Sequence, residues 1–374
     1  MKTHVAVLYG GRSTEHEVSC RSASFVLKNL DPEKFQVHAI GIGKDGAWWP
    51  QESSKLLANL PISIPIHSVG SSKPVRVEGV DPFTSALAAL CGIAESDRET
   101  VLRDRFVVFP VLHGAYGEDG TMQGMLELAD VAFVGPDTMG SAIGMDKVVS
   151  KRLVQAAGVP VVPWIDFRES KWRNERDVLI DRCIERLGSP IFVKPARLGS
   201  SVGVSKVRNR TDLAKAIDEA FLYDDKVLVE RGMDVREIEC AALGGYEPLI
   251  SIAGEVVPHA DFYSYEAKYL DAKGASVVVP AQLTRAQLEK VQQLTREIFA
   301  ALELYGMARI DLFLDKHDNT FYFNEVNTIP GFTQISQYPM LWNASGVSAK
   351  LLVETLVDSA LARHRAKRKL VRSK

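Results

Sequence analysis

Ala308-Arg309-Ile310-Asp311 and Asn324-Glu325-Val326-Asn327 are the two stretches that decide the fold. Residues two apart share one face of a strand, so Arg309 points the same way as Asp311, and Glu325 points the same way as Asn327. Between the stretches, Lys316-His317-Asp318-Asn319 has the composition of a turn. A hairpin centred on Asp318 would place Asp311 opposite Glu325 and Arg309 opposite Asn327.

This hairpin predicts a metal site. Directly opposed carboxylates, with Cβ atoms about 5 Å apart, destabilise a sheet unless a cation lies between them. Hard oxygen ligands on one rigid face are what Mg²⁺ binds when it also holds substrate phosphates. The alternative is a solvated hairpin face on which Arg309 neutralises both acids. The polar turn at residues 327–331, directly beside the acids, favours the metal site.

A glycine-rich segment at residues 194–203, Lys-Pro-Ala-Arg-Leu-Gly-Ser-Ser-Val-Gly, lies at the tip of a second predicted hairpin. Its backbone N–H groups and two hydroxyls can cover phosphates. It is not a Walker loop, because no Lys-Ser or Lys-Thr follows the second glycine of a G-x-x-x-x-G spacing. Lys194 and Lys147 would supply cations for nucleotide phosphates, although each lysine taken singly would be assigned to the surface.

The segment Gly10-Gly11-Arg12-Ser13-Thr14-Glu15 is a strand-to-helix turn suited to an anion. It lacks the third glycine of G-x-G-x-x-G and a ribose-binding acid at the expected distance, which excludes a dinucleotide fold. Glu15 would hold a substrate ammonium or, equally well from this segment alone, complement the helix dipole.

The bulk composition is that of an ordinary globular protein. The 374 residues suggest two or three domains, and 46% of them are hydrophobic and 25% charged. Lys plus Arg total 45 against 47 Asp plus Glu, a net charge of -2, so nucleic acid is not an expected partner.

The four cysteines lie far apart and form no CxxC pair, which favours a reducing cytoplasm over a disulfide framework or a zinc cluster. The first apolar run, residues 5–9, is too short for a signal peptide. No apolar stretch has transmembrane length, so we expect no membrane association and a cytoplasmic location.

Strand and helix signals alternate along the chain, which predicts an α/β fold. The predicted strands are residues 5–9, 36–42, 106–112, 131–134, 161–167, 191–193, 202–207, 226–230, 237–243, 308–314 and 320–326. The predicted helices are residues 17–30, 82–91, 121–129, 146–157, 176–187, 212–221, 284–304 and a terminal helix from about 348. We interpret residues 46–105 as an insertion and the basic tail, residues 363–374, as a frayed, solvated helix end.

These segments together resemble the D-alanine:D-alanine ligase family of the ATP-grasp superfamily. Seven motifs in the order of that family carry the resemblance: residues 10–19, 113–120, 145–147, 194–203, 266–269, 309–311 and 324–331. The resemblance implies a three-domain α/β ATP-grasp architecture with an N-terminal open α/β (pre-ATP-grasp) domain. The expected domains are an N-terminal substrate domain (1–135), a central subdomain with a glycine-rich flap (136–229) and a C-terminal subdomain with the metal and substrate site (230–374).

The resemblance also implies roles for single residues in an ATP-dependent ligation of two D-alanines through an acyl phosphate, for peptidoglycan precursor synthesis. Residues that match the family's ATP contacts are Lys147, Lys194 and Lys268 for the phosphates, Glu230, Arg231 and Phe262 near the adenine, Glu237 on the ribose, and Asn324. Two Mg²⁺ ions, for which Mn²⁺ can substitute, would be bound by Asp311, Glu325 and Asn327.

The amino-acid substrates match a further set of residues. Glu15 would hold the ammonium of the first D-alanine, with Val18 and His113 close by. The second D-alanine and the developing oxyanion would be met by Arg309, Gly331, Ser336 and Gln337. Glu15, Ser200 and Tyr269 match a hydrogen-bonded network that ties the closed loop over the site.

Two other functions fit part of this pattern. A D-alanine:D-lactate ligase would share nearly every motif, and the Glu-Ala-Lys-Tyr segment at residues 266–269 favours the dipeptide enzyme. A non-catalytic nucleotide-binding regulator would be expected to lose an acid such as Asp311 or Glu325, and both are present. The resemblance further implies a homodimer.

Overall fold

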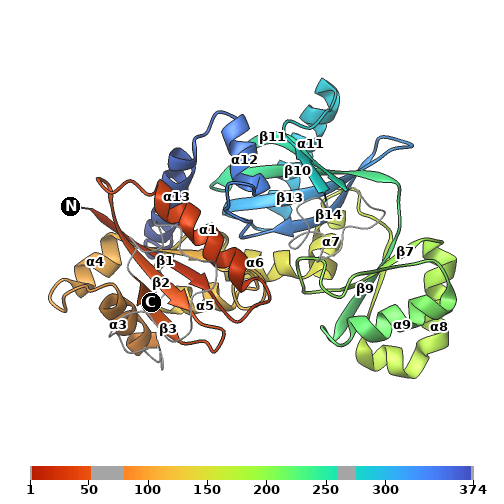
Figure 1. The fold of residues 1–374 in the computed structure, drawn as a ribbon, viewed down its shortest axis with the longest axis horizontal. Coiled ribbons are helices and arrows are strands. Elements are labelled where there is room, and N and C mark those ends of the chain that lie inside the picture. Colours follow the sequence, from red (N-terminus) through yellow and green to blue (C-terminus); the bar gives the residue numbers. More distant parts are fainter. Residues whose placement is uncertain (1, 52–79, 259–274, 372–374) are drawn as a thin grey trace.

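Three β-sheets follow one another along the chain and lie side by side in the fold (Figure 1). The computed structural model describes residues 2–51, 80–258 and 275–371. In this part of the chain, no helix combines the length and the hydropathy needed to cross a lipid bilayer. All four cysteines are unpaired and buried.

The first sheet has the strand order β3-β2-β1-β4-β5 and is parallel except at β3. Its strands are β1 (Thr3–Gly10), β2 (Phe35–Ile42), β3 (Trp48–Gln51), β4 (Phe106–Val111) and β5 (Ala132–Phe133). Its helices are α1 (His16–Asn29), α3 (Val80–Leu90), α4 (Arg98–Asp104) and α5 (Thr121–Leu128). Alternate residues of β1 face two different cores, which is the pattern of a sheet covered on both faces.

Within residues 46–105, the helix predicted at 82–91 is present as α3, and the described ends of the segment are part of the first sheet and its core. β3 pairs with β2 and extends the sheet, and Phe83 and Leu87 of α3 lie in the core beneath it. The strand was missed because Trp48-Trp49-Pro50-Gln51 lacks the alternation of a half-buried strand and contains a proline, which is tolerated only at a sheet edge.

The second sheet is antiparallel, in the order β6-β9-β7-β8. Its strands are β6 (Trp164–Arg168), β7 (Ile191–Pro195), β8 (Ser205–Val207) and β9 (Lys226–Arg231), and its helices are α8 (Glu169–Leu187) and α9 (Arg210–Ala220). Helices α6 (Thr138–Met145) and α7 (Lys147–Ala156) precede this sheet along the chain and contact β14 (Phe321–Asn327) of the third sheet. Helices α8 and α9 pack on one face, at the right of Figure 1. The predicted domain boundary after residue 229 falls inside β9, whose ladder partners all lie in this sheet.

The third sheet is antiparallel, in the order β12-β11-β10-β13-β14. Its elements are β10 (Val235–Gly244), β11 (Leu249–Pro258), β12 (Ala275–Val278), α11 (Arg285–Ala301), β13 (Gly306–Asp315), β14 (Phe321–Asn327), α12 (Gln337–Ala344) and α13 (Ala349–Arg368). A capping box formed by Thr284 and Gln287 begins α11, which packs against one face of the sheet.

Helix α13 joins the first and third sheets, because its apolar face shares one core with β1, α1 and α12. The prediction of a solvated tail holds for residues 368–371, which are exposed, but not for Arg363 at the start of that segment. Arg363 is 6% exposed and donates to the carbonyl oxygens of Gly135 (2.7 Å) and Phe133 (2.9 Å). Lys367 pairs with Glu127 at 2.7 Å, so the basic residues of the last turns fasten α13 to the N-terminal unit.

Candidate active site

The acidic hairpin forms with the register that its sequence predicts. β13 and β14 pair so that Asp311 lies opposite Glu325 and Arg309 opposite Asn327, with a bulge directly after Asp311. The face is not solvated, since Asp311 is only 8% exposed. Nε and Nη2 of Arg309 each donate to one carboxylate oxygen of Asp311, both at 2.8 Å.

Glu239 is a second acid on Arg309 that sequence reasoning missed. It lies on β10, paired with Asp311 across the ladder, and its Oε2 is 2.9 Å from Arg309 Nε. Burial opposes the charge on Arg309, but Asp311 and Glu239 outweigh it and hold the pKa of the guanidinium above its usual range. The alternation in Arg236-Glu237-Ile238-Glu239-Cys240 was the available signal, because it places Glu239 on a strand within a polar stripe.

The residues present fit a divalent metal ion bound together with phosphates. Asp311 and Glu325 are opposed carboxylates, and the amide of Asn327, which donates to Asp311 Oδ2 at 2.9 Å, lies one pleat further on the same face. Nζ of Lys147 is 3.0 Å from Glu325 Oε2. Among residues 2–51, 80–258 and 275–371, no three His, Cys, Asp or Glu side chains are placed to hold a metal ion together, so the donors on this face are two carboxylates and one amide.

Three lysines gather beside the hairpin, and one of them was not predicted. Glu230 is buried between Lys194 (2.5 Å) and Lys151 (2.7 Å), and Lys194 Nζ also lies 3.4 Å from Asn324 Oδ1. Burial raises the pKa of Glu230, but the two lysines outweigh it and lower the pKa to about 2. Lys151 follows Lys147 by four residues on α7, a spacing that places both on one helix face.

The glycine-rich loop connects β7 to β8, as the predicted hairpin requires. Leu198 O accepts a hydrogen bond from Lys147 Nζ at 2.7 Å. Ser200 and Ser201 have φ of +54° and +58°, and Ser200 Oγ donates to Glu15 Oε1. The loop tip from the second unit is therefore held on the N-terminal unit, and two of the three residues expected to share a network are in contact.

The loop after β4 and the turn after β14 are joined by the buried His113 and the half-buried Glu118. His113 Nδ1 lies 2.9 Å from Ile329 O, and its Nε2 lies 3.1 Å from Ser22 Oγ. Glu118, which sequence reasoning did not single out, accepts from the N–H groups of Gly114 (2.7 Å) and Ile329 (3.1 Å). Burial and the nearby charge of Glu15 raise the pKa of Glu118 to about 8.

The remaining predicted substrate residues lie around the turn after β14 and in α1. A Cβ at Gly331 would lie 2.8 Å from Ser336 Oγ, which itself accepts from Thr333 N at 3.0 Å, so a side chain at position 331 would require Ser336 to move. Gln337 is buried in the first turn of α12, and Val18 is half-buried in the first turns of α1.

Of the other predicted residues, Arg231 points away from the lysine cluster, Glu237 lies near Lys194, and three lie outside the described ranges. The Arg231 guanidinium donates to the carbonyl oxygens of Leu187 and Arg186, both at 3.1 Å, and so is committed to the end of α8. Glu237 lies on β10, two residues before Glu239. Phe262, Lys268 and Tyr269 lie outside the described residues.

A lysine cluster and a glycine-rich loop of the central unit face an acidic hairpin of the C-terminal unit. Together with the three sheets, this arrangement defines an ATP-grasp architecture. Two family models match the chain, "D-ala D-ala ligase N-terminus" over residues 4–136 and "D-ala D-ala ligase C-terminus" over residues 153–358. The chain belongs to the D-ala D-ala ligase family.

Individual relatives agree with this assignment over the whole chain. The chain is 46% identical to D-alanine--D-alanine ligase A of Bradyrhizobium diazoefficiens, over 99% of this chain and 98% of that protein. Its fold matches the solved D-alanine-D-alanine ligase of Coxiella burnetii with a TM-score of 0.82 and 34% identity, covering 99% and 97% of the two chains. The VanG D-Ala:D-Ser ligase of Enterococcus faecalis matches with a TM-score of 0.78 and 31% identity, covering 96% and 100%.

Proposed function

We propose that this protein joins two D-alanine molecules into D-alanyl-D-alanine, converting ATP to ADP and phosphate, and so supplies the dipeptide for peptidoglycan precursors. The observation that supports this most strongly is the acidic hairpin, in which Asp311 lies opposite Glu325, Glu325 pairs with Lys147, and Lys147 in turn holds the glycine-rich loop. Family membership over nearly the whole chain supports the same conclusion.

ATP would bind between the second and third sheets. Lys147, Lys194 and Lys268 would contact its phosphates, with Asn324 beside Lys194. Glu230, Arg231 and Phe262 would lie near the adenine and Glu237 on the ribose. Because Glu230 and the side chain of Arg231 already have partners, they would shape the adenine site mainly through the backbone of β9.

Asp311, Glu325 and Asn327 would hold two Mg²⁺ ions, which Mn²⁺ can replace. When bound, the metal neutralises negative charge that spreads over the transferring phosphoryl group. Two cationic side chains also contact these carboxylates, since Arg309 pairs with Asp311 and Lys147 pairs with Glu325.

The first D-alanine would be bound by Glu15 at its ammonium group, near Val18 and His113. Its carboxylate oxygen attacks the γ-phosphorus of ATP, and an acyl phosphate and ADP form. The amine of the second D-alanine, held near Ser336 and Gln337, then attacks the acyl carbon as a neutral group. Arg309 and the N–H of Gly331 would stabilise the oxyanion, phosphate leaves, and the nitrogen loses a proton.

Water must be kept from the acyl phosphate during this sequence. The bond from Ser200 to Glu15 supports the proposal that the glycine-rich loop covers the reacting atoms. Tyr269 would complete the network that holds the loop closed.

The test is ATP-dependent phosphate release with D-alanine, with the product identified by mass, across a panel that includes D-serine, D-lactate and L-alanine. We expect D-alanyl-D-alanine to be the main product. A depsipeptide or a D-Ala-D-Ser product as the main species, or phosphate release without a condensed product, would overturn the assignment.

We also propose a homodimer in the cytoplasm. The four buried, unpaired cysteines support a reducing compartment, and ATP is available there. Light scattering of the purified protein would test the dimer, and a monomer across the working concentration range would exclude it.

A further inference from the structure

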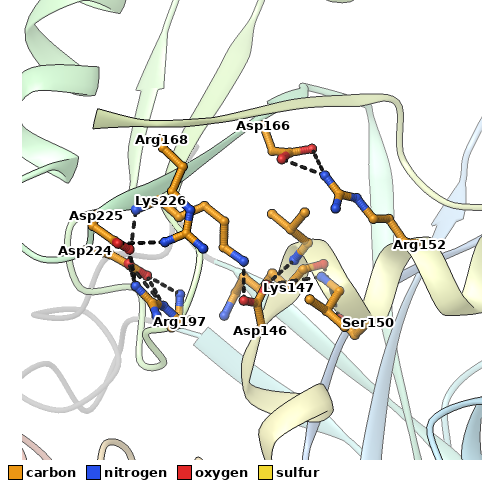
Figure 2. Close-up of polar contacts among 12 residues, drawn as sticks. Asp146, Lys147, Ser150, Arg152, Asp166, Arg168, Arg197, Asp224, Asp225 and Lys226 are labelled. Atoms are coloured by element: carbon orange, nitrogen blue, oxygen red, sulfur yellow. Dashed lines mark hydrogen bonds and ion pairs between the residues drawn. The ribbon is translucent and has the colours of Figure 1, made fainter. Parts of the chain in front are cut away.

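An ion-pair network holds the start of the glycine-rich loop, and none of the chemistry above uses it (Figure 2). The backbone N–H of Arg197 donates to Asp224 Oδ2 at 2.7 Å. Its Nε donates to Oδ1 and Oδ2 of Asp224 at 3.1 and 3.2 Å, and its Nη2 contacts both Asp224 and Asp225. One short side chain therefore fixes both the backbone and the guanidinium of the second residue of the loop.

Asp224 is well placed for this because its own position is fixed. Its side chain is 3% exposed, and its Oδ1 also accepts from the N–H of Lys226, the first residue of β9, at 3.1 Å. Ala196 lies between β9 and α7, since its N–H donates to Lys226 O and its carbonyl accepts from Lys147 N. The ammonium of Lys226 pairs with Asp146, which caps α7 (Figure 2).

The same turn, residues 223–225, also contacts the far end of the loop. Gly203 has a φ of +68°, and a Cβ there would lie 2.8 Å from Tyr223 Cδ2 and 2.9 Å from Pro195 Cγ. The loop thus has a start that is hydrogen-bonded to this turn, a far end that packs closely beside it, and a tip, at Ser200, that bonds to Glu15.

We propose that Arg197 and Asp224 form a clamp that positions the glycine-rich loop for nucleotide phosphates. They are positioning residues, since their effect passes through the loop and through Leu198 O, which holds the ammonium of Lys147. When the ends of a loop are already fixed, less conformational entropy is lost as the loop orders on a ligand. The ligand therefore binds more tightly. The proposal rests on the proposed function only for the identity of the nucleotide.

A purely electrostatic role would give a different result. Asp224→Asn removes a negative charge near the phosphate loop and would strengthen the binding of an anion if charge alone mattered. Arg197→Gln removes a positive charge and would weaken it. The clamp predicts that both substitutions weaken binding, because either one releases the loop.

The experiment measures the Kd of a non-hydrolysable ATP analogue with Mg²⁺ by calorimetry on the full chain. We expect Asp224→Asn and Arg197→Gln each to raise the Kd about tenfold, the size of one charge-assisted hydrogen-bonded contact. The double variant should bind no more weakly than the weaker single variant, because the two residues act as one unit. Arg197→Lys, which keeps the charge but loses the planar fork, should lie between the parent and Arg197→Gln.

Asp166→Asn is the matched control. Asp166 lies on β6 of the same sheet, away from the loop, and pairs with Arg152 at 2.8 and 2.9 Å (Figure 2). The substitution removes this ion pair and should change the Kd by less than about twofold. Should Asp224→Asn fail to fold, Arg197→Gln and Arg197→Lys carry the test, because the Arg197 side chain is 45% exposed.

An unchanged or tighter Kd for Asp224→Asn, an additive loss in the double variant, or an equal loss in the control would each overturn the clamp. A parent that binds the analogue but makes no dipeptide would remove the proposed function and leave the clamp standing. The two failures are thus distinguishable.

Discussion

Glu230 keeps its charge inside the protein because two lysines share it. Each of its carboxylate oxygens faces a different ammonium, Lys151 on one side and Lys194 on the other. Lys151 is completely buried and also donates to Phe323 O at 3.2 Å, so it ties α7 to β14 as well as to β9. Breaking such a buried pair from one side leaves a charge without full compensation.

Lys151→Met should therefore lower the free energy of unfolding by about 3 kcal/mol, as measured by urea denaturation. Lys171→Met, at a half-exposed position on α8, is the control and should change it by less than about 0.5 kcal/mol. Equal stability of the two variants would contradict a structural role for the Lys151–Glu230 pair.

Glu325→Gln should nearly abolish turnover and leave the fold intact. The amide keeps the shape of the side chain but removes the charge opposite Asp311 that we assign to metal binding. Phosphate release at saturating Mg²⁺ and the thermal unfolding midpoint give the two readouts, with Glu289→Gln on the exposed face of α11 as control. Activity within about threefold of the parent would remove Glu325 from the metal site.

The residues that sequence reasoning found and those that it missed differ in a physical way. Asp311 and Glu325 face each other because side chains alternate along a strand and because one turn connects the two strands. Both features can be read from a short stretch of sequence. Glu239 meets Arg309 only because β10 pairs with β13, and these strands are separated by residues 245–305 of the chain. Lys151 and Glu118 likewise acquire their roles from packing between distant segments, which no local pattern encodes.

At the scale of elements, the strands β1 and β2 carry a stacked pair of histidines. Nδ1 of His4 lies 3.1 Å from Nε2 of His38, and their rings are 5.2 Å apart. Burial, and then the charge of the neighbouring ring, lower the pKa of His38 to about 4. Burial and then Arg105 lower the pKa of His4 as well.

A lowered pKa means that the unfolded chain takes up a proton before the folded one does. The contribution of His38 to stability is therefore complete above about pH 6.5 and is lost as the pH falls toward 4. Between pH 7 and 4.5 the parent should lose about 2 kcal/mol more than His38→Gln, measured by urea unfolding at each pH. His317→Gln, at an exposed turn, should follow the parent, and identical slopes for parent and His38→Gln would exclude this account.

The glycine-rich loop is the element whose state should depend most on ligand. ATP with Mg²⁺ should slow proteolysis within residues 196–203, because phosphates bound beneath the loop would favour its closed form. Trypsin cleavage after Arg197, followed by mass spectrometry, measures this, with cleavage after Lys316 in the β13–β14 turn as the internal control. Equal rates with and without nucleotide would count against a lid.

The elements themselves were predictable where their patterns were long. The apolar spacing predicts a helix at residues 176–187, whereas α8 begins earlier, at Glu169. Glu175, directly before the predicted start, has non-helical backbone angles. β8 begins at Ser205, later than predicted. Val202 and Val204 lie in turns inside the loop, where their N–H groups donate to Gly199 O and Ser201 O. The alternation of hydrophobic residues within the loop therefore gave the sequence pattern of a strand.

At the scale of the whole molecule, the first and third sheets share a core through α13. This could not be predicted from the charge of residues 363–374, because the positive charge of the tail conceals which of its residues face inward. Arg363 lies between the rings of Phe133 (4.6 Å) and Tyr305 (4.9 Å), one from each unit. Burial lowers the pKa of Arg363, with Asp137 acting in the opposite direction.

Arg363→Met tests whether the N-terminal and C-terminal units unfold together. The substitution leaves the carbonyl oxygens of Gly135 and Phe133 buried without their donor, at a cost of about 1–3 kcal/mol each, and relieves part of the cost of burying a cation. We expect a net loss of about 2 kcal/mol in the free energy of unfolding, with fluorescence and circular dichroism shifting by the same amount, because a shared core makes both units part of one transition. Arg365→Met, exposed on the same helix, should stay within about 0.5 kcal/mol of the parent. The opposite outcome is two separate transitions in the Arg363 variant, one for the first sheet and one for the nucleotide-binding units. That result would show that α13 packs on the N-terminal unit without coupling the stability of that unit to the stability of the other two.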